Sequence, residues 1–453
     1  MGLHTSQVDK AFGVASKALL ALYTLEIGLA AILFGLYKAS TFDVALLATK
    51  AGILLLTGVA LAVVAIATTL RLIRRDRRGW LLALSTNVIS VAVVLALGEV
   101  VVRSMSRPSA NGITVGSIAI RPTWSELREQ IHGMRADIDT FFISDPEIGW
   151  TVGPNRRSAN GLYSSSAEGL RSAVQGVRLS DEQSDYRVAL IGDSNAFSLE
   201  VPFEDSLGYH LAQILGDRAQ VLNFGVDAYG IDQIYMRYRR DVRPWKPKVV
   251  IVAFIQHDLM RTMMVYPFIG LGWPGHLVKP RFDVVDGQIV EINKPLPSRT
   301  QIMQTRSMRD LPFIAYDEAY ASEDWEWRFD DGPMLLRFLT SLSPRWVGRP
   351  VSGNADTETL NSGLLNQLTE LIERDGATPI LVYLPHWTEP DPLARSTIAR
   401  SGLKVMDMTQ CLSRVPADQR LVPSGHHYTG SGNRAIAQCT APPVRCAAGL
   451  GCD

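Results

Sequence analysis

The stretch V-A-L-I-G-D-S-N, from Val188 to Asn195, decides the fold of this chain. Its apolar residues predict a buried strand, and a Gly-Asp-Ser turn follows before a helix begins. This order places the Ser194 hydroxyl at the carboxyl edge of a parallel sheet, where ligands bind in open α/β folds. The Ser194 amide can face the same place and stabilise an oxyanion. A Gly-Asp-Ser turn alone is a weak signal, so its surroundings decide the interpretation.

The sequence around this stretch alternates between strands and helices. The segment Val249 to Ile255 is almost entirely β-branched, which is typical of a strand buried on both faces of a parallel sheet. Alternation of this kind implies a parallel sheet covered by helices. We expect strands at Tyr186–Ile191, Ala219–Phe224, Val249–Ile255, Pro379–Leu384 and Leu403–Met406, and helices at Ser206–Leu215, Ile231–Val242, Thr357–Arg374 and Gly430–Ala441.

The α/β alternation defines a predicted domain at residues 186–445, with other segments before it and inside it. Residues 105–185 form a predicted linker and N-terminal extension, in which Pro, Ser, Asn and Gly between 107 and 113 indicate a linker and 124–142 has helical spacing. Residues 262–350 form a predicted insertion over the sheet. Asp286-Gly287 indicates a hairpin there, and the aromatic residues of the insertion either line a substrate groove or pack the insertion itself.

Two histidines near the C-terminus can supply a base for Ser194. A serine becomes nucleophilic only with a base beside it. The segment P-S-G-H-H-Y-T-G-S-G-N places His426 and His427 in a Gly-rich loop just before a predicted helix. Taken alone, this segment is equally typical of surface histidines in a turn.

Four blocks, taken in order, resemble the SGNH (GDSL) hydrolases, a family of flavodoxin-like α/β esterases, lipases and carbohydrate acyltransferases. The resemblance covers residues 145–440 and implies a three-layer domain with a parallel sheet. The blocks are Gly192-Asp193-Ser194 with V-P-F-E-D-S-L from Val201, N-F-G-V-D-A-Y-G from Asn223, F-I-Q-H-D-L from Phe254 and H-Y-T-G-S-G-N from His427. Upstream, D-P-E-I-G-W from Asp145 and A-E-G-L-R-S from Ala167 resemble membrane-anchored members.

The resemblance implies that Ser194 is the nucleophile and His427 the base. Gly432 stands five residues beyond His427, as in the family pattern, which favours His427 over His426. Two expected oxyanion-hole positions depart from the pattern. Ala228 replaces a glycine, and its amide can still serve if φ stays negative. His257 replaces an asparagine, and its imidazole N–H can donate in the same way.

The third departure concerns the group that orients the histidine. The family carries an aspartate three residues before the histidine, and Ser424 stands there. A carboxylate normally orients the imidazole and stabilises its charged form. Three alternatives follow. Ser424 or a backbone carbonyl orients the ring; another carboxylate, Asp407 or Asp258, does so; or the domain is degenerate and only binds a ligand.

The first hundred residues predict a membrane anchor, residues 1–104, with three transmembrane helices. The runs Ala18–Tyr37, Ala51–Leu70 and Trp80–Val102 are almost free of charge, and a bilayer core needs about 20 apolar residues in a helix. Five arginines between Arg71 and Arg78 keep the loop between the last two runs in the cytoplasm. Residues after 105 are therefore expected outside the cytoplasmic (inner) membrane, which is the periplasm in a Gram-negative cell.

Charge and cysteine content agree with an exported, non-nucleic-acid-binding domain. The formal net charge is +0, which argues against a nucleic-acid partner. All the cysteines lie near the C-terminus, and their even number suggests two disulfides in an exported region. They are Cys411, Cys439, Cys446 and Cys452. Nothing in the sequence indicates a metal or an organic cofactor.

These features together predict a membrane-anchored, extracytoplasmic serine esterase or O-acyltransferase. Its partners would be an acyl ester substrate and, through the three helices, the lipid bilayer. An acetylated envelope polysaccharide and a lipid ester are both candidate substrates. The alternative function is that of a catalytically degenerate SGNH domain, which serves as a carbohydrate-binding or assembly component.

Overall fold

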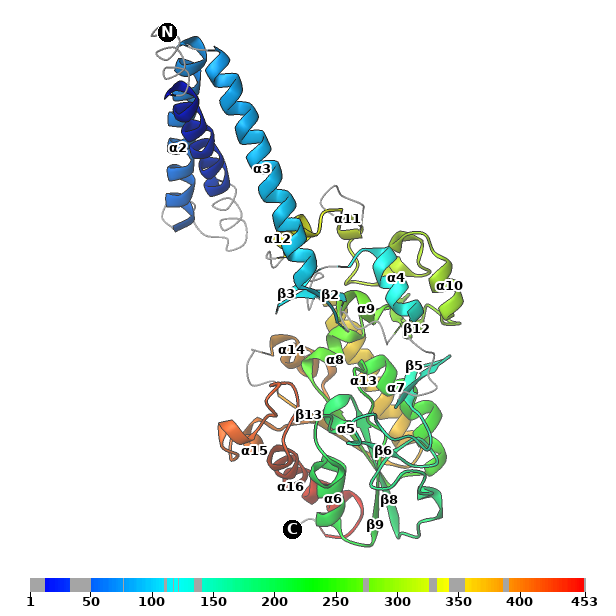
Figure 1. Ribbon diagram of the computed structural model, residues 1–453. Helices are drawn as coiled ribbons and strands as arrows, with labels where there is room; N and C mark the ends of the chain where they lie inside the picture. Colours follow the sequence, from blue (N-terminus) through cyan, green and yellow to red (C-terminus); the bar gives the residue numbers. More distant parts are fainter. Residues whose placement is uncertain are drawn as a thin grey trace, which may run out of the picture. The chain divides into compact units, whose positions relative to one another are not determined.

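The computed structural model divides the chain into two compact units, one with residues 1–108, 113–120 and 328–344 and one with the remainder. It describes residues 13–32, 50–75, 77–109, 112–116, 118–120, 122–133, 141–271, 277–325, 332–341, 355–385 and 391–451. Figure 1 colours these units along the sequence.

The first unit contains three helices that are long and apolar enough to cross a membrane, as predicted. They are Gly13–Ile32, α2 (Lys50–Arg75) and α3 (Arg77–Met105). Residues 33–37 of the first predicted run lie outside the described residues. The Asn87 side-chain amide of α3 donates to Glu26 Oε1 of the first helix at 3.0 Å, so the acidic residue of the first predicted span has a polar partner on another helix.

The region after α3 is more regular than the predicted linker. Residues Ser106–Ser109 form β1, Gly112–Val115 form β2 and Ile118–Ile120 form β3, with β2 and β3 antiparallel. The linker predicted at 107–113 overlaps these short strands, and β-branched residues beyond Gly112 support their pairing.

Helix α12 (Met334–Ser341), within the predicted insertion, belongs to this first unit. Its N-terminus is capped by Glu99 of α3, whose carboxylate accepts from the Met334 amide at 3.0 Å and the Leu335 amide at 2.7 Å. A carboxylate at the start of a helix satisfies amides that lack partners inside the helix. The insertion thus sends one helix to the unit that holds the apolar helices.

The second unit is built on a five-stranded, all-parallel sheet (Figure 1). The sheet order is β14-β13-β10-β8-β9. Every residue of the central strand β10 is buried, as its β-branched composition predicts. The five strands match the predicted ones to within two residues at either end: β8 is Tyr186–Gly192, β9 Ala219–Asn223, β10 Val249–Phe254, β13 Thr378–Tyr383 and β14 Val405–Asp407.

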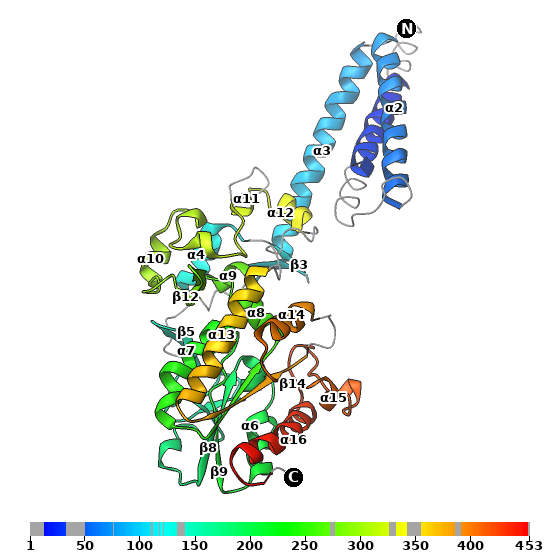
Figure 2. The same ribbon diagram turned by 180° about the vertical axis from the view of Figure 1, so that it is seen from behind.

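Helices cover both faces of this sheet and complete three layers. On one face, α6 (Leu207–Leu215) and α16 (Gly430–Ala447) pack side by side against β8 and β10 (Figure 2). On the other face, α7 (Ile231–Arg237) and α13 (Ala355–Arg374) bury their apolar residues. Burial of one Val, Leu or Ile side chain contributes about 1.5–3 kcal/mol, so the two cores fix the layers. The predicted fold class is confirmed.

The predicted helix at 231–242 changes character before its end. Helix α7 ends at Arg237, and Tyr238–Val242 continue as a π-helical turn. The predicted helix at 124–142 is also shorter, because α4 spans Trp124–Gly133 and residues 134–140 lie outside the described residues. After it come two small hairpins, β4 (Phe142–Asp145) with β5 (Gly149–Val152) and β6 (Ser164–Ser165) with β7 (Arg171–Ser172).

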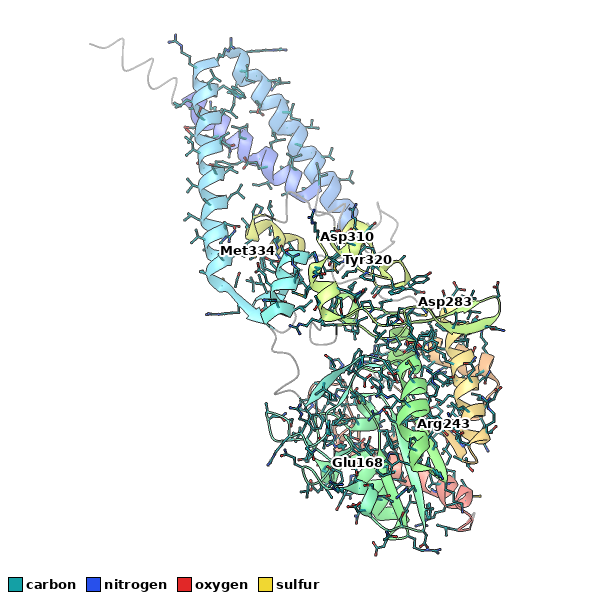
Figure 3. All side chains as sticks on the ribbon, turned by 90° about the vertical axis from the view of Figure 1, so that its right-hand side faces the viewer. Glu168, Arg243, Asp283, Asp310, Tyr320 and Met334 are labelled. Carbon is teal, nitrogen blue, oxygen red and sulfur yellow. A yellow bond between two sulfur atoms is a disulfide. The ribbon has the colours of Figure 1, made fainter. Side chains whose placement is uncertain are left out.

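The insertion contains a lysine of a buried ion pair and the predicted hairpin. Lys279 pairs with Asp232 of α7, and both side chains are buried. Strands β11 (Phe282–Val285) and β12 (Gln288–Glu291) pair across Asp286 and Gly287, whose φ values of 51° and 75° are those of a hairpin turn. Figure 3 shows Asp283 on this hairpin and Asp310 and Tyr320 in the segment that follows.

The structure identifies one of the two predicted disulfides. Cys411 of α15 (Thr409–Leu412) is bonded to Cys439 of α16, which joins two segments 28 residues apart. Cys446 is also disulfide-bonded, whereas Cys452 lies outside the described residues. The first of these bonds ties down α16, the helix that begins three residues after His427.

Candidate active site

Ser194 begins a one-turn helix at the carboxyl edge of the sheet. Strand β8 ends at Gly192, where any side chain would collide with the carbonyl of Ala253 in the neighbouring strand. Asp193 then caps α5 (Ser194–Phe197) by accepting from the Asn195 amide at 2.9 Å. A glycine for the close approach and an aspartate for the cap thus hold Ser194 in place, with its side chain largely buried.

His427 lies directly against Ser194. Its Nε2 atom is 3.0 Å from Ser194 Oγ. The loop that carries it is fixed on both sides, because its carbonyl accepts from the Val422 amide at 2.9 Å and the next residue, Tyr428, donates its hydroxyl to the Pro385 carbonyl at 2.6 Å. The alternative base, His426, is exposed. The structure thus brings the residue chosen from the motif spacing to the serine.

The other nitrogen of this imidazole faces a carboxylate that the sequence did not single out. Glu200 Oε2 lies 2.5 Å from His427 Nδ1, and the Ser424 hydroxyl donates to the same oxygen at 2.7 Å. With the Nδ1 proton on the Glu200 side, Nε2 is left as an acceptor for the proton of Ser194. Partial burial raises the pKa of Glu200, but hydrogen bonds from His427 and Ser424 and the charge of His427 outweigh it, so this pKa falls below its usual value.

The predicted orienting groups therefore need correction. Ser424 contacts Glu200 and not the imidazole. Asp407 is engaged at the start of α15, where it accepts from the Thr409 amide at 2.8 Å and from the Thr409 hydroxyl at 2.5 Å. Asp258 is buried and pairs with Arg261 at 2.8 Å. Each side chain is held by a local partner, and the carboxylate beside the histidine is Glu200.

Glu200 was missed because the family pattern places the carboxylate next to the histidine. Here it comes from the nucleophile's own loop, six residues after Ser194. The available signal was the short distance along the chain: α5 has only one turn, and Pro202 follows soon after, so the intervening residues have to stay near Ser194.

The predicted oxyanion position at Ala228 has an unexpected backbone conformation. Its φ is 59°, so the condition set for its amide, a negative φ, is not met. A left-handed conformation costs an alanine about 1–2 kcal/mol, and the surroundings impose it. Trp150 Nε1 donates to the Asp227 carbonyl at 2.8 Å, and the Tyr229 hydroxyl donates to the Trp150 carbonyl at 2.6 Å. The motif at 145–150 thus supports the turn that carries Ala228.

The second predicted oxyanion donor, His257, lies at the same edge of the sheet. It is the second residue of α8 (Gln256–Arg261), which begins just beyond the carboxyl end of β10, and it is partly buried. Strand β8, which pairs with β10, is followed by the equivalent turn, and that turn carries Ser194. This placement makes a role near the serine feasible, and that role stays a proposal.

Two buried carboxylates and one arginine lie beneath the nucleophile. Arg261 Nη1 is 2.8 Å from Asp258 Oδ1 and 3.4 Å from Asp193 Oδ2. Burial, together with the negative charge of Asp193, raises the pKa of Asp258 well above its usual value. Arg261 also donates to the Tyr229 carbonyl at 3.4 Å. The arginine links the nucleophile's turn to the turn of Ala228.

Within the described ranges, no cluster of His, Cys, Asp and Glu could hold a metal ion.

Comparison with known proteins gives structural matches only. No protein-family model matches the chain, and no curated protein matches it significantly. Similar solved structures include a lipolytic protein of the G-D-S-L family from Desulfitobacterium hafniense DCB-2, with 15% identity over 56% of this chain and 98% of that one and a TM-score of 0.30. A lipase/acylhydrolase from Enterococcus faecalis has 12% identity over 57% and 95% of the two chains (TM-score 0.31). The acetylxylan esterase Axe2 from Geobacillus stearothermophilus has 12% identity over 57% and 94% (TM-score 0.30).

The assignment of the fold rests on the molecule itself. The sheet is parallel, and the Gly-Asp-Ser turn follows β8, which lies between the central strand β10 and the edge strand β9. The C-terminal histidine loop contacts the serine just before α16 begins. The α/β part of the chain therefore has the three-layer fold with a parallel sheet that was predicted, and it brings the serine and the histidine of the two motifs together.

Proposed function

We propose that this chain is a membrane-anchored serine hydrolase of acyl esters that acts outside the cytoplasmic membrane, by hydrolysis or by O-acyl transfer. The observation that carries the proposal is the continuous contact from Ser194 Oγ to His427 Nε2, at 3.0 Å, and from His427 Nδ1 to Glu200, at 2.5 Å. A serine, a base and a group that orients the base are the parts that nucleophilic catalysis at an ester requires.

The reaction follows from this arrangement. Ser194 Oγ attacks the acyl carbon, and His427 Nε2 takes the serine proton. Glu200 stabilises the imidazolium that forms. His427 then returns a proton to the leaving alcohol, which leaves an acyl group on Ser194. Water or the hydroxyl of an acceptor attacks this acyl-enzyme with His427 again as base, which gives hydrolysis or transfer.

The negative charge of the tetrahedral intermediate needs donors at the sheet edge. We assign the backbone amides of Ser194 and Ala228 and the imidazole of His257 to this role. The left-handed backbone at Ala228 does not meet the condition of a negative φ, so Ala228 enters the assignment by its place in the motif and by the turn that holds it. Preorganised donors of this kind contribute a large part of catalysis in acyl transfer.

The site and the apolar helices suggest the substrate's location. Three helices of membrane-spanning length precede the α/β unit. The disulfide between Cys411 and Cys439 favours an oxidising compartment. An acylated envelope polysaccharide or a lipid ester would meet the enzyme there. The alternative is a catalytically degenerate domain that only binds carbohydrate or serves in assembly. It is favoured by the replacement of the family aspartate and asparagine, and Glu200 weakens the first of these two reasons.

The proposed nucleophile is tested by hydrolysis of p-nitrophenyl acetate with the full-length protein in detergent. Ser194→Ala should lower turnover by at least about 1000-fold, because the group that forms the covalent intermediate is gone. Circular dichroism should be unchanged. Equal turnover by the wild type and the variant would mean that another group carries the reaction.

The orienting role of Glu200 is tested by removing its charge. Because the pKa of Glu200 lies below its usual value of 4.5, its carboxylate is ionised throughout the neutral range. Glu200→Gln keeps the shape but loses this charge, and kcat should fall by about 1000- to 10,000-fold at pH 7.5, as for other triad carboxylates. Asp407→Asn is the matched control and should retain turnover within a few-fold. Loss in the control alone would restore Asp407 as the orienting group.

The oxyanion role of His257 predicts different outcomes for two substitutions. His257→Asn supplies an amide donor and should keep most of the turnover. His257→Ala removes the donor and should lower kcat by about 100- to 1000-fold with a small change in KM. An alanine variant within a few-fold of wild type, in an enzyme that needs Ser194, would remove His257 from the mechanism.

The proposed topology is tested with alkaline phosphatase, which is active only after export. A fusion after residue 110 should be active, whereas a fusion after Arg75, in the basic segment, should not. The opposite pattern would place the α/β unit in the cytoplasm and contradict the proposed location.

A further inference from the structure

The loop that carries Glu200 has a backbone that its own sequence does not favour. Ser198 and Glu200 have φ values of 63° and 66°, in the left-handed region that non-glycine residues rarely adopt. The loop is short, because α5 ends at Phe197 and Pro202 follows Val201. Contacts from elsewhere in the unit therefore have to hold residues 198–201 in this shape.

Arg171 supplies most of these contacts. Its guanidinium donates from Nη1 to the carbonyls of Phe197 and Ser198, and from Nη2 to the carbonyl of Val201, each at 2.6 Å. The side chain is buried, and the guanidinium lies over the rings of Tyr163 at 5.1 Å and Phe197 at 4.6 Å. The three carbonyls lie on both sides of Glu200, so the arginine fixes the ends of the loop.

Tyr163 holds Glu200 itself. Its hydroxyl oxygen accepts from the Glu200 backbone amide at 2.7 Å. The hydroxyl of Ser198 accepts from the Leu207 amide at 2.9 Å, which ties the same loop to the start of α6. The loop is thus bound at its amide and its carbonyls, while the Glu200 carboxylate is left to the imidazole and to Ser424.

The chemistry of Arg171 is unusual for a packing residue. Burial lowers the pKa of its guanidinium to about 10, so it still carries its charge at neutral pH. A buried charge is costly unless it is well paired. The hydrogen bonds described above all go to the carbonyls of one loop, and the planar guanidinium can serve carbonyls on both sides at once. The free-energy cost of burying this charge is best explained by a requirement for the position of that loop.

We propose that Arg171 and Tyr163, in the extension before the sheet, are positioning residues that set the Glu200 carboxylate against His427. This inference rests on the proposed function, because it assigns them a part in keeping the Ser194–His427–Glu200 chain closed. A shift of about 1 Å in a group that takes part in catalysis can lower the rate by a factor on the order of 100. The extension is thereby a component of the active site and not only a connection to the membrane helices.

The experiment compares four full-length variants and one control variant in detergent, with p-nitrophenyl acetate as the probe substrate. Arg171→Lys keeps the charge but cannot reach all three carbonyls. Tyr163→Phe keeps the ring and removes one acceptor. Glu200→Gln, alone and combined with Arg171→Lys, completes a double-mutant cycle. Arg237→Lys is the matched control, because Arg237 is also a buried arginine over an aromatic ring, and its hydrogen bonds go to Thr151 and Asp241 instead.

We expect Arg171→Lys to lower kcat by about 10- to 100-fold with KM changed less than about threefold, the size of a modest displacement of a catalytic group. Tyr163→Phe should lower kcat by several-fold, in line with a single hydrogen bond. In the Glu200→Gln background, Arg171→Lys should have little further effect, because the group that it positions is no longer a carboxylate. The Arg237→Lys control should retain kcat even if its unfolding midpoint falls as much as that of Arg171→Lys.

Two results would overturn the proposal. Equal losses of kcat from Arg171→Lys in the wild-type and Glu200→Gln backgrounds would show that Arg171 acts independently of Glu200. An equal loss in Arg237→Lys would show a general effect of removing a buried arginine. A wild-type protein without Ser194-dependent turnover would instead reject the proposed function, and the positioning role with it, so the two failures are distinguishable.

Discussion

The contact between His427 Nδ1 and the Glu200 carboxylate, at 2.5 Å, is the interaction on which the rest of the site depends. It fixes the tautomer that lets Nε2 accept the serine proton. It also joins the two ends of the α/β unit, because Ser194 and Glu200 follow β8 while His427 precedes α16. The parallel sheet makes this meeting possible by bringing the loops after its strands to one edge, and the disulfide to Cys439 holds α16 beside it.

The extension before the sheet explains two motifs that the α/β alternation leaves outside the domain. Trp150, in the motif at 145–150, supports the turn of Ala228, and Arg171, in the motif at 167–172, supports the loop of Glu200. Both side chains donate to backbone carbonyls, and each of these carbonyls belongs to a residue that has a left-handed backbone or stands next to one in the sequence. The strain in the two site loops is therefore balanced by buried hydrogen bonds from one preceding segment, which has to fold together with the sheet.

Much of the fold could be predicted because its elements are encoded locally. The strand Val249–Phe254 is buried on both faces, and its β-branched composition predicts this burial even when its partner strands are unknown. Ser194 and His427 could be chosen because each lies in a short motif at an element boundary. Glu200 lies only six residues after Ser194, but no motif marks it, because its role depends on a loop shape held by Arg171 of the preceding extension. The left-handed backbone at Ala228 and the short strands after α3 likewise depend on contacts that sequence periodicity does not contain.

The central claim is that Ser194 forms a covalent intermediate with His427 and Glu200 in support. The most direct measurement is peptide mapping by mass spectrometry after reaction of the full-length protein with a fluorophosphonate, with heat-unfolded protein as the control. The account predicts one adduct, on the peptide that contains Ser194, formed only by the folded protein. An adduct on a different residue, or equal labelling of folded and unfolded protein, would contradict it.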